Sequence, residues 1–313
     1  MKERLIVSAS PHLHKGESVS RIMWMVAISL LPAGIAGVII FGLSALSVII
    51  LAVVSALVTE WILQISTKRK ITIFDGSAVI TGLLLAYNLP PKVPFWLPII
   101  GAFFSIAIGK QIFGGLGQNI FNPALVGRVF LMASWPKYMT SFTVPLSYDA
   151  TTQATPLMLL KEGKFAEHIS YGNLFLGLRG GCIGEVCILA LILGAAFLFW
   201  KKYISWHIPI TYIVTVGIFT YLFGPSGFLS GDWLFHILSG GLILGAFFMA
   251  TDYVTSPLTR KGQIVFGIGC GILTAIIRLW GGYPEGASYA ILIMNAATPL
   301  VDRYTKNRIY GNR

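Results

Sequence analysis

Apolar runs of helical length follow one another along most of this chain, separated by short polar turns. A helix needs about 20 apolar residues to cross the hydrocarbon core of a bilayer. The runs at residues 21–41 and 43–65 reach that length with only Arg21 and Glu60 as charged residues. We predict about ten membrane spans, at residues 21–41, 43–65, 77–89, 94–113, 122–132, 182–200, 207–223, 233–250, 263–280 and 283–300.

The composition agrees with this interpretation. Hydrophobic residues make up 55% of the 313 residues and charged residues 11%, whereas a soluble domain has about 25% charged residues. The formal net charge is +11. The basic residues lie in short clusters between apolar runs, as membrane topology requires, and not in one patch. We therefore predict an all-α polytopic membrane protein without a nucleic-acid partner.

Lysine and arginine clusters predict the orientation of the chain, because cytoplasmic loops are enriched in these residues. The clusters at 68–70, 201–202 and 303–313 are placed in the cytoplasm with both termini, and residues 224–232, which lack both types, are placed outside. Three regions result: a first transmembrane repeat at 1–132 with a basic cytoplasmic N-terminus, an extracytoplasmic loop at 133–181, and a second transmembrane repeat at 182–313 with a basic cytoplasmic C-terminus.

An internal repeat relates the two halves. The same order of residue types occurs in each, as Lys110, Gly114, Gly115 and Asn122 in the first half and as Arg278, Gly281, Gly282 and Asn295 in the second. Halves with five spans each insert with opposite orientation, which gives an inverted repeat, and interrupted segments in such folds mark the binding region. The same glycines also suit close helix packing, and the two interpretations are compatible.

A polar segment, residues 149–156, differs from everything around it. It reads Asp-Ala-Thr-Thr-Gln-Ala-Thr-Pro. Pro156 lacks an N–H and biases Thr155 toward an extended backbone, so we expect the Thr155 hydroxyl on an accessible loop and not packed against a helical turn. An ordinary turn-rich loop is the alternative interpretation of the same composition.

The pattern Asp-x-x-Thr-x-Ala-Thr resembles the recognition sequence of proteins that carry FMN through a phosphoester bond, made by a separate flavin transferase. Three further motifs occur in matching order: Phe74–Ala78, Gly114–Asn119 followed by Phe121–Ala124, and Phe248–Asp252. With these motifs the chain resembles the D subunit of the Rnf electron-transport complex over nearly its whole length. More distantly, it is similar to the B subunit of the Na+-translocating NADH:quinone reductase. Tyr253 stands where such relatives often have proline.

The resemblance implies covalent FMN on Thr155, with Asp149, Thr152 and Ala154 serving recognition by the transferase. It implies two inverted five-helix repeats, similar to those of urea transporters, in a bacterial or archaeal cell membrane. The complex would transfer electrons between reduced ferredoxin and NAD+, coupled to movement of Na+ or H+. Its other subunits and membrane lipid would be the partners, and this chain would not bind NAD, in keeping with the lack of a GxGxxG segment after a strand.

A second, non-covalent flavin (riboflavin or FMN) is expected within the membrane region. Irregular backbone there must be buried in protein or line a site, because lipid satisfies no N–H or C=O group. A flat flavin ring suits such a place, and the site needs no catalytic side chain of its own. Asn122 and Asp252 are the candidate contacts.

Ionisable residues inside apolar runs are functional candidates, because they are costly there. They are Glu60, Asp75, Lys110, Glu185, His236, Asp252 and Arg278. Snorkelling or capping near span ends explains most of them, and Asp75 and Asp252 rank highest because they flank interrupted elements. Lys110 and Arg278, at equivalent repeat positions, are expected to face anionic groups of a flavin or lipid phosphate.

Three cysteines, Cys182, Cys187 and Cys270, have no metal-binding spacing and are interpreted as structural, so no metal site is predicted. Two alternatives to the redox subunit remain. One is a urea-type channel or small-solute transporter of the same fold without a redox role. The other is a structural anchor for partner subunits. The acceptor motif around Thr155 favours the redox subunit, because a passive channel has no need of it.

Overall fold

The computed structural model describes residues 18–146, 152–162, 170–224, 227–283 and 285–306. Three of the described helices are long and apolar enough to cross a membrane: α1 (Val19–Phe41), α2 (Leu43–Ser66) and α13 (Arg260–Leu279). Shorter apolar helices accompany them, namely α3 (Ser77–Tyr87), α4 (Trp96–Ile106), α5 (Pro123–Ser134), α9 (Ile188–Trp200) and α10 (His207–Leu222). The chain is therefore a multi-pass helical membrane protein, as the sequence predicts.

The surface of α2 shows how the bundle is built for a lipid environment. Small residues face inward, since Ala52 and Ala56 are fully buried, whereas the large residues Val54, Val58 and Ile62 are each about half exposed. This distribution reverses that of a soluble helix. Small residues let neighbouring backbones approach closely, and large apolar side chains are compatible with lipid tails.

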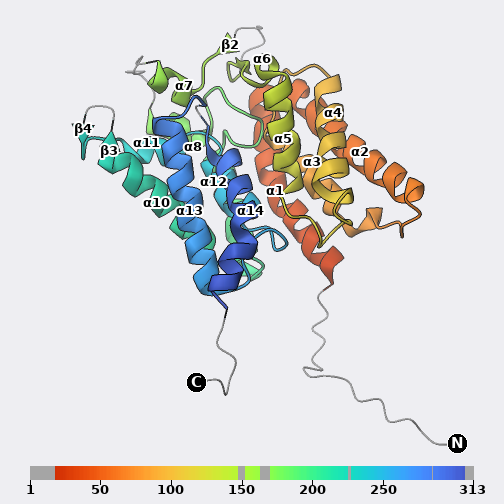
Figure 1. The fold of residues 1–313 in the computed structure, drawn as a ribbon. Helices are drawn as coiled ribbons and strands as arrows, with labels where there is room; N and C mark the ends of the chain where they lie inside the picture. The colour runs from red at the N-terminus through yellow and green to blue at the C-terminus, as the bar shows by residue number, and fades with distance from the viewer. Residues whose placement is uncertain (1–17, 147–151, 163–169, 225–226, 284, 307–313) are drawn as a thin grey trace, which may run out of the picture.

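The helices form two groups, which lie side by side in Figure 1. The first contains α1 to α5 with η1 (Ile73–Asp75) and the π-helical turn η2 (Ala107–Gln111), and the second contains α9 to α14, ending with α14 (Ala287–Tyr304). The two groups have corresponding helix contacts. In the first, α2 packs on α4 and α4 on α5, and in the second, α10 packs on α13 and α13 on α14. Between the groups, α1 packs on α9 and α5 contacts α14.

The predicted span at residues 233–250 is not one continuous helix. It is divided into α11 (Trp233–Leu238), α12 (Leu242–Leu244) and the π-helical turn η3 (Gly245–Met249). Gly240 lies in the break at φ +66°, a conformation that favours glycine. The expectation of an unbroken span here is wrong, because the apolar composition that suggested it does not specify backbone continuity.

The predicted span at residues 182–200 also begins later than expected, because residues 182–187 are irregular and α9 starts at Ile188. This mostly buried stretch pairs with backbone at the C-terminal end of α3. The N–H of Ile183 donates to the carbonyl of Leu89 (3.0 Å), and the N–H of Gly184 donates to that of Tyr87 (3.1 Å). Irregular backbone from the second half thereby satisfies carbonyls at and just beyond the end of a helix in the first.

In the described part of the connection between the groups, the elements are short. They are α6 (Pro136–Met139), β1 (Phe142–Thr143), β2 (Thr152–Gln153), α7 (Pro156–Lys161) and α8 (Tyr171–Leu176). Strands β1 and β2 are antiparallel, with Phe142 opposite Gln153 and Thr143 opposite Thr152. A second two-stranded ribbon, β3 (Phe223–Gly224) with β4 (Gly227–Phe228), follows α10. In Figure 1, α6, β2 and α7 lie at one end of the bundle, whereas α1 begins and α14 ends at the other.

Candidate functional site

A cavity of about 800 Å³, counted with the open space at its mouth, lies between the two groups of helices. Its polar lining comes from both halves, with Ser77, Thr81, Lys110, Asn119 and Asn122 from the first and Thr251 and Asp252 from the second. Apolar and aromatic residues complete the wall, among them Leu84, Leu116, Phe247, Phe248 and Tyr253. A few polar groups in a mostly apolar wall are typical of a site for an amphipathic organic ligand.

Asn122 and Asp252, predicted from sequence as flavin contacts, both line this cavity. The polar atoms of Asn122 already have partners: Nδ2 donates to the carbonyl of Met249 (3.2 Å), and Oδ1 caps α5 by accepting from the N–H of Ala124 (3.1 Å). The carboxylate of Asp252 accepts from the hydroxyl of Thr255 (3.2 Å) within its own turn. The structure thus brings the two residues to one cavity and gives each a structural role as well.

Asn119 was not singled out from the sequence, although it lies in one of the motifs. It is 5% exposed and lines the cavity, where its side-chain oxygen Oδ1 is buried without a hydrogen-bond partner in the described residues. Its Nδ2 donates to the carbonyl of Phe121 (3.1 Å), which fixes the side chain. Because a buried unpaired acceptor is unfavourable, Asn119 points to a ligand or water that donates to it.

Gly114, Gly115 and Gly117 precede Asn119 and all have positive φ angles, between +92° and +123°. An L side chain rarely adopts this backbone, so the glycines permit the tight turn that returns the chain from η2 to α5. Leu116, within the turn, reaches the cavity wall. The described residues of the second interrupted segment, at 281–295, are not among those that line this cavity. Among the described residues, the first interrupted segment therefore lines this cavity, and the second contacts it through Asn295, whose Oδ1 accepts from the N–H of Asn122.

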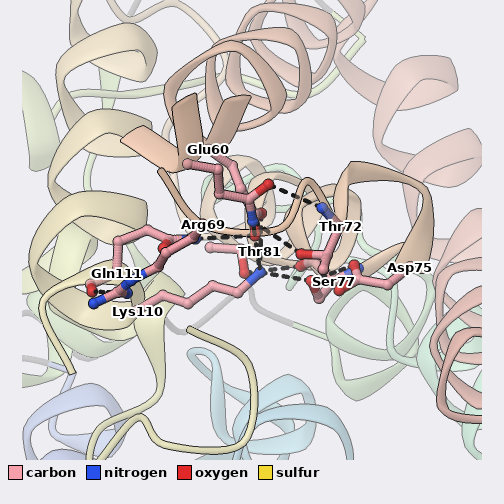
Figure 2. A network of polar contacts seen from close by, with 9 residues as sticks. Glu60, Arg69, Thr72, Asp75, Ser77, Thr81, Lys110 and Gln111 are labelled. Carbon is pink, nitrogen blue, oxygen red and sulfur yellow. Dashed lines mark hydrogen bonds and ion pairs between the residues drawn. The ribbon is translucent and has the colours of Figure 1, made fainter. Parts of the chain in front are cut away.

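Lys110 and Glu60 form a buried ion pair beside the cavity (Figure 2). The ammonium Nζ donates to both carboxylate oxygens, at 2.7 and 2.9 Å, and to the hydroxyl of Ser77, at 2.6 Å. Ser77 in turn donates from its N–H to Asp75 (2.7 Å), so the predicted candidate Asp75 belongs to the same network. Snorkelling, the explanation expected for most of the ionisable residues, does not apply to Glu60, and Lys110 does not reach lipid phosphate, because the side chains are 0% and 2% exposed and satisfy each other.

Arg278 was expected to face lipid phosphate or a flavin, and the structure contradicts the lipid contact. The residue is 3% exposed, and its guanidinium donates to the carbonyls of His236 and Ser239 (3.1 Å for the latter). Arg179, also buried, donates to the carbonyl of Leu238 (2.6 Å). The two arginines thus satisfy carbonyls at the end of α11, where a helix leaves such groups unpaired.

A second charged cluster lies near this break. Arg128 donates to Glu285 and to the side-chain oxygen of Asn88, and the three residues link α5, the residue after α3 and the turn before α14. Glu185 accepts from the N–H of Cys182 through Oε1 (3.1 Å), while its Oε2 is buried without a partner among the described residues. Sulfur and carboxylate atoms of Cys182, Glu185 and Glu285 lie within 4.8 Å of one another. The sequence spacing of the cysteines gives no signal for this grouping, because Glu285 comes from far along the chain.

Thr155 caps α7, which Pro156 begins. Its hydroxyl accepts a hydrogen bond from the N–H of Met158 (3.3 Å), and the residue is 4% exposed. The extended backbone expected for Thr155 is observed, at φ −66° and ψ 154°. The expectation of an accessible hydroxyl that is not packed against a helical turn is wrong, because threonine followed by proline is also a favourable helix start.

The other motif residues are only partly described. Ala154 is half-buried beside Thr155, Thr152 lies in β2, and Asp149 falls outside the described residues. The segment is fastened to the second group by α7. Lys161 donates from Nζ to the carbonyls of Gly281 (2.5 Å) and Tyr283 (2.6 Å), which follow the end of α13. Partial burial lowers the pKa of this lysine.

The fold and the cavity define a class: a polytopic helical membrane protein with an internal cavity between two groups of helices. Comparison with known proteins narrows it. The chain belongs to the family described as "NQR2, RnfD, RnfE family", which matches residues 6–311.

Relatives match over nearly their full length. The chain is 53% identical over 310 residues to the D subunit of the Na(+)-translocating ferredoxin:NAD(+) oxidoreductase complex of Acetobacterium woodii, covering 98% of this chain and 95% of that one. It is 50% identical over 323 residues to the D subunit of the proton-translocating ferredoxin:NAD(+) oxidoreductase complex of Clostridium ljungdahlii, covering 100% and 98%. It is 38% identical to the D subunit of the ion-translocating oxidoreductase complex of Salmonella newport, covering 98% of each.

Proposed function

We propose that this chain is the membrane-embedded D subunit of an ion-translocating ferredoxin:NAD+ oxidoreductase complex. The observation that carries the proposal is the end-to-end similarity to proteins of that name, at 50% and 53% identity. The other subunits of such a complex are then its partners. The urea-type channel is not retained, since those relatives are oxidoreductase subunits by name.

Thr155 is the proposed attachment site of FMN, through a phosphoester made by a flavin transferase that reads Asp149, Thr152 and Ala154. The support is the motif together with the position of Thr155 at the start of a segment docked on the second group of helices. Thr155 is buried in the structure, where the residue is 4% exposed. Attachment therefore requires that α7 be open, or not yet packed, when the transferase acts.

The cavity is the proposed site of a second, non-covalent flavin, riboflavin or FMN. Its residues suit such a ligand: Asn119 offers an unpaired acceptor, and Lys110 and Ser77 offer polar contacts on the same wall. The flavin would supply electron transfer, while these side chains hold and orient it and the apolar wall excludes water. Phe248 and Tyr253 give flat surfaces for ring contact.

We further propose two inverted five-helix repeats, with both termini in the cytoplasm and the α6–α8 region outside. Three features support this arrangement. The packing of α2 on α4 corresponds to that of α10 on α13, and α5 contacts α14. In addition, α7 lies at the end of the bundle opposite to the start of α1 and the end of α14 (Figure 1). Under this arrangement α12 and η3 correspond to α3, so the broken segment at 239–241 corresponds to the turn that precedes α3.

The experiment that tests the function is extraction of flavin from the purified complex. Acid precipitation should release non-covalent flavin into the supernatant and leave fluorescent FMN on this chain after denaturation. Deletion of the chain should abolish ferredoxin-dependent NAD+ reduction by membranes. A complex with neither kind of flavin on this chain, or membranes that keep full activity without it, would contradict the proposal.

A further inference from the structure

Lys110 stands between two environments. Its ammonium is held by Glu60 on one side, and the residue also lines the cavity beside Ser77. Of the described residues that line the cavity, Lys110 is the one that carries a positive charge. Lys110 belongs to the π-helical turn η2, and such turns often mark functional positions in helices. A lysine side chain is flexible, so its ammonium can change partners while its backbone remains in place.

Glu60, by contrast, does not line the cavity, and its side chain is 0% exposed. Its oxygen Oε1 accepts from the amides of Gln64 (3.0 Å) and Gln111 (3.1 Å) in addition to Lys110. Lys110 therefore separates Glu60 from the cavity. The surrounding amide and hydroxyl groups also contain oxygens, which together with a carboxylate are the ligand type that hard cations prefer.

A short polar connection leads from Glu60 to the turn after α2 (Figure 2). The amide nitrogen Nε2 of Gln64 donates to Glu60, and the same nitrogen donates to the hydroxyl of Thr72 (2.9 Å). Arg69 donates to the carbonyl of Gln111 (2.9 Å) and closes the network on the same side. Residues 67–71 of this turn are exposed, and the basic cluster at 68–70 is one of those that predict a cytoplasmic position. Glu60 is thus one side chain away from an exposed turn.

We propose that Glu60 binds the coupling cation, Na+ or H+, and that it takes up this cation from the cytoplasmic side when negative charge in the cavity draws Lys110 away. The inference rests on the proposed function, because the negative charge is an electron delivered to the cavity ligand by the oxidoreductase reaction. Lys110 keeps its protons and changes its partner from the carboxylate to the ligand. One electron enters the cavity and one cation enters at Glu60, so the region remains neutral.

Because the Glu60–Lys110 pair is buried, movement of Lys110 leaves Glu60 without a counter-charge and favours cation uptake there. A carboxylate inside a membrane protein is strongly destabilised once its counter-charge has left. The other charged groups around Glu60 do not replace Lys110. Asp75, on η1, adds a further negative charge, and Arg69 is bonded to a carbonyl. A cation that enters from solvent at the exposed turn is the remaining source of neutralising charge.

Cation binding by the purified complex tests the inference. The complex is equilibrated with radioactive sodium at fixed pH, oxidised or chemically reduced, and the retained label is counted after rapid gel filtration. In the wild type, reduction should increase the retained sodium. Glu60→Gln should lose this increase, and Lys110→Met should retain sodium equally in both states, because its Glu60 is never paired. Asp232→Asn, a carboxylate-to-amide change at the start of α11, should behave like the wild type.

A second arm distinguishes protons from sodium. Proton uptake on reduction is followed with an indicator dye in weak buffer without sodium, and a proton site gives the same pattern of variants there. Acid-extracted flavin is measured in every sample. Glu60→Gln with normal flavin and wild-type uptake of both cations would overturn the inference. A wild-type complex without extractable flavin would instead overturn the proposed cavity ligand, and this inference with it. If Glu60→Gln fails to assemble, the double variant Glu60→Gln/Lys110→Met removes both charges and should show no redox-dependent uptake.

Discussion

The backbone N–H of Asn122 donates a hydrogen bond to Oδ1 of Asn295, 3.2 Å away, and joins the two halves of the chain. These are positions that the internal sequence repeat pairs. Both residues are buried, at 2% and 1% exposure, and Nδ2 of Asn295 continues the connection to the carbonyl of Thr255 (3.1 Å). The contact fixes α14 against the start of α5, at the wall of the cavity.

Replacing Asn295 by alanine should destabilise the protein by about 1–3 kcal/mol, because it leaves the buried N–H of Asn122 without its acceptor. The measurement is the free energy or midpoint of unfolding of the purified chain in detergent. Ser205→Ala is the control, since it removes one hydrogen bond to Gln263 within the second half. Equal, small effects of the two substitutions would show that the Asn122–Asn295 contact does not hold the halves together.

The positions of most apolar helices were predictable because they depend on local signals. Apolar runs gave the helices near their observed bounds, and Asn122 and Asp252 were placed at the cavity from motifs flanking interrupted segments. The break at Gly240 was missed, because residues 233–250 are apolar on both sides of it. A helix break inside a membrane depends on partners such as Arg179 and Arg278, which are remote in sequence.

The ion pair of Glu60 with Lys110 lay beyond sequence reasoning for a similar reason. The two residues are 50 positions apart, and each alone resembles a charge near the end of a span. Thr155 shows the opposite failure, since the local signal was present but admitted two interpretations. A threonine before proline has an extended backbone under both interpretations. Because the six-residue helix α7 follows it, Thr155 is a buried helix cap.

Asn119 should hold the non-covalent ligand of the cavity more directly than Asn122 does. Asn119→Leu removes the unpaired acceptor, so the affinity of the cavity for flavin should fall by roughly tenfold, as expected for the loss of one buried hydrogen bond worth about 1–1.5 kcal/mol. Acid-extractable flavin of the washed complex should fall with it. Covalent FMN on the same chain should be unaffected. Asn122→Ala should mainly lower stability, because its side chain bonds Met249 and caps α5. Normal extractable flavin in Asn119→Leu would exclude Asn119 as a ligand contact.

The orientation of the bundle is tested by labelling single cysteines in intact cells. A cysteine replacing Lys161, at the end of α7, should react with an impermeant maleimide, because this position is exposed and placed outside. A cysteine replacing Lys201, after α9, should react only when the cells are opened. The reverse pattern would show that the topology is inverted and that the segment around Thr155 lies in the cytoplasm.

The most direct test of the central claim is the intact mass of the chain, purified from cells with and without the flavin transferase. Wild type, Thr151→Ala and Thr155→Ser should each gain the mass of one FMN less one water, only when the transferase is present. Thr155→Asn should gain none, although asparagine caps a helix as well as threonine does, so α7 is retained while the acceptor hydroxyl is lost. An adduct on Thr155→Asn, or an unmodified wild-type chain in cells that contain the transferase, would contradict the account.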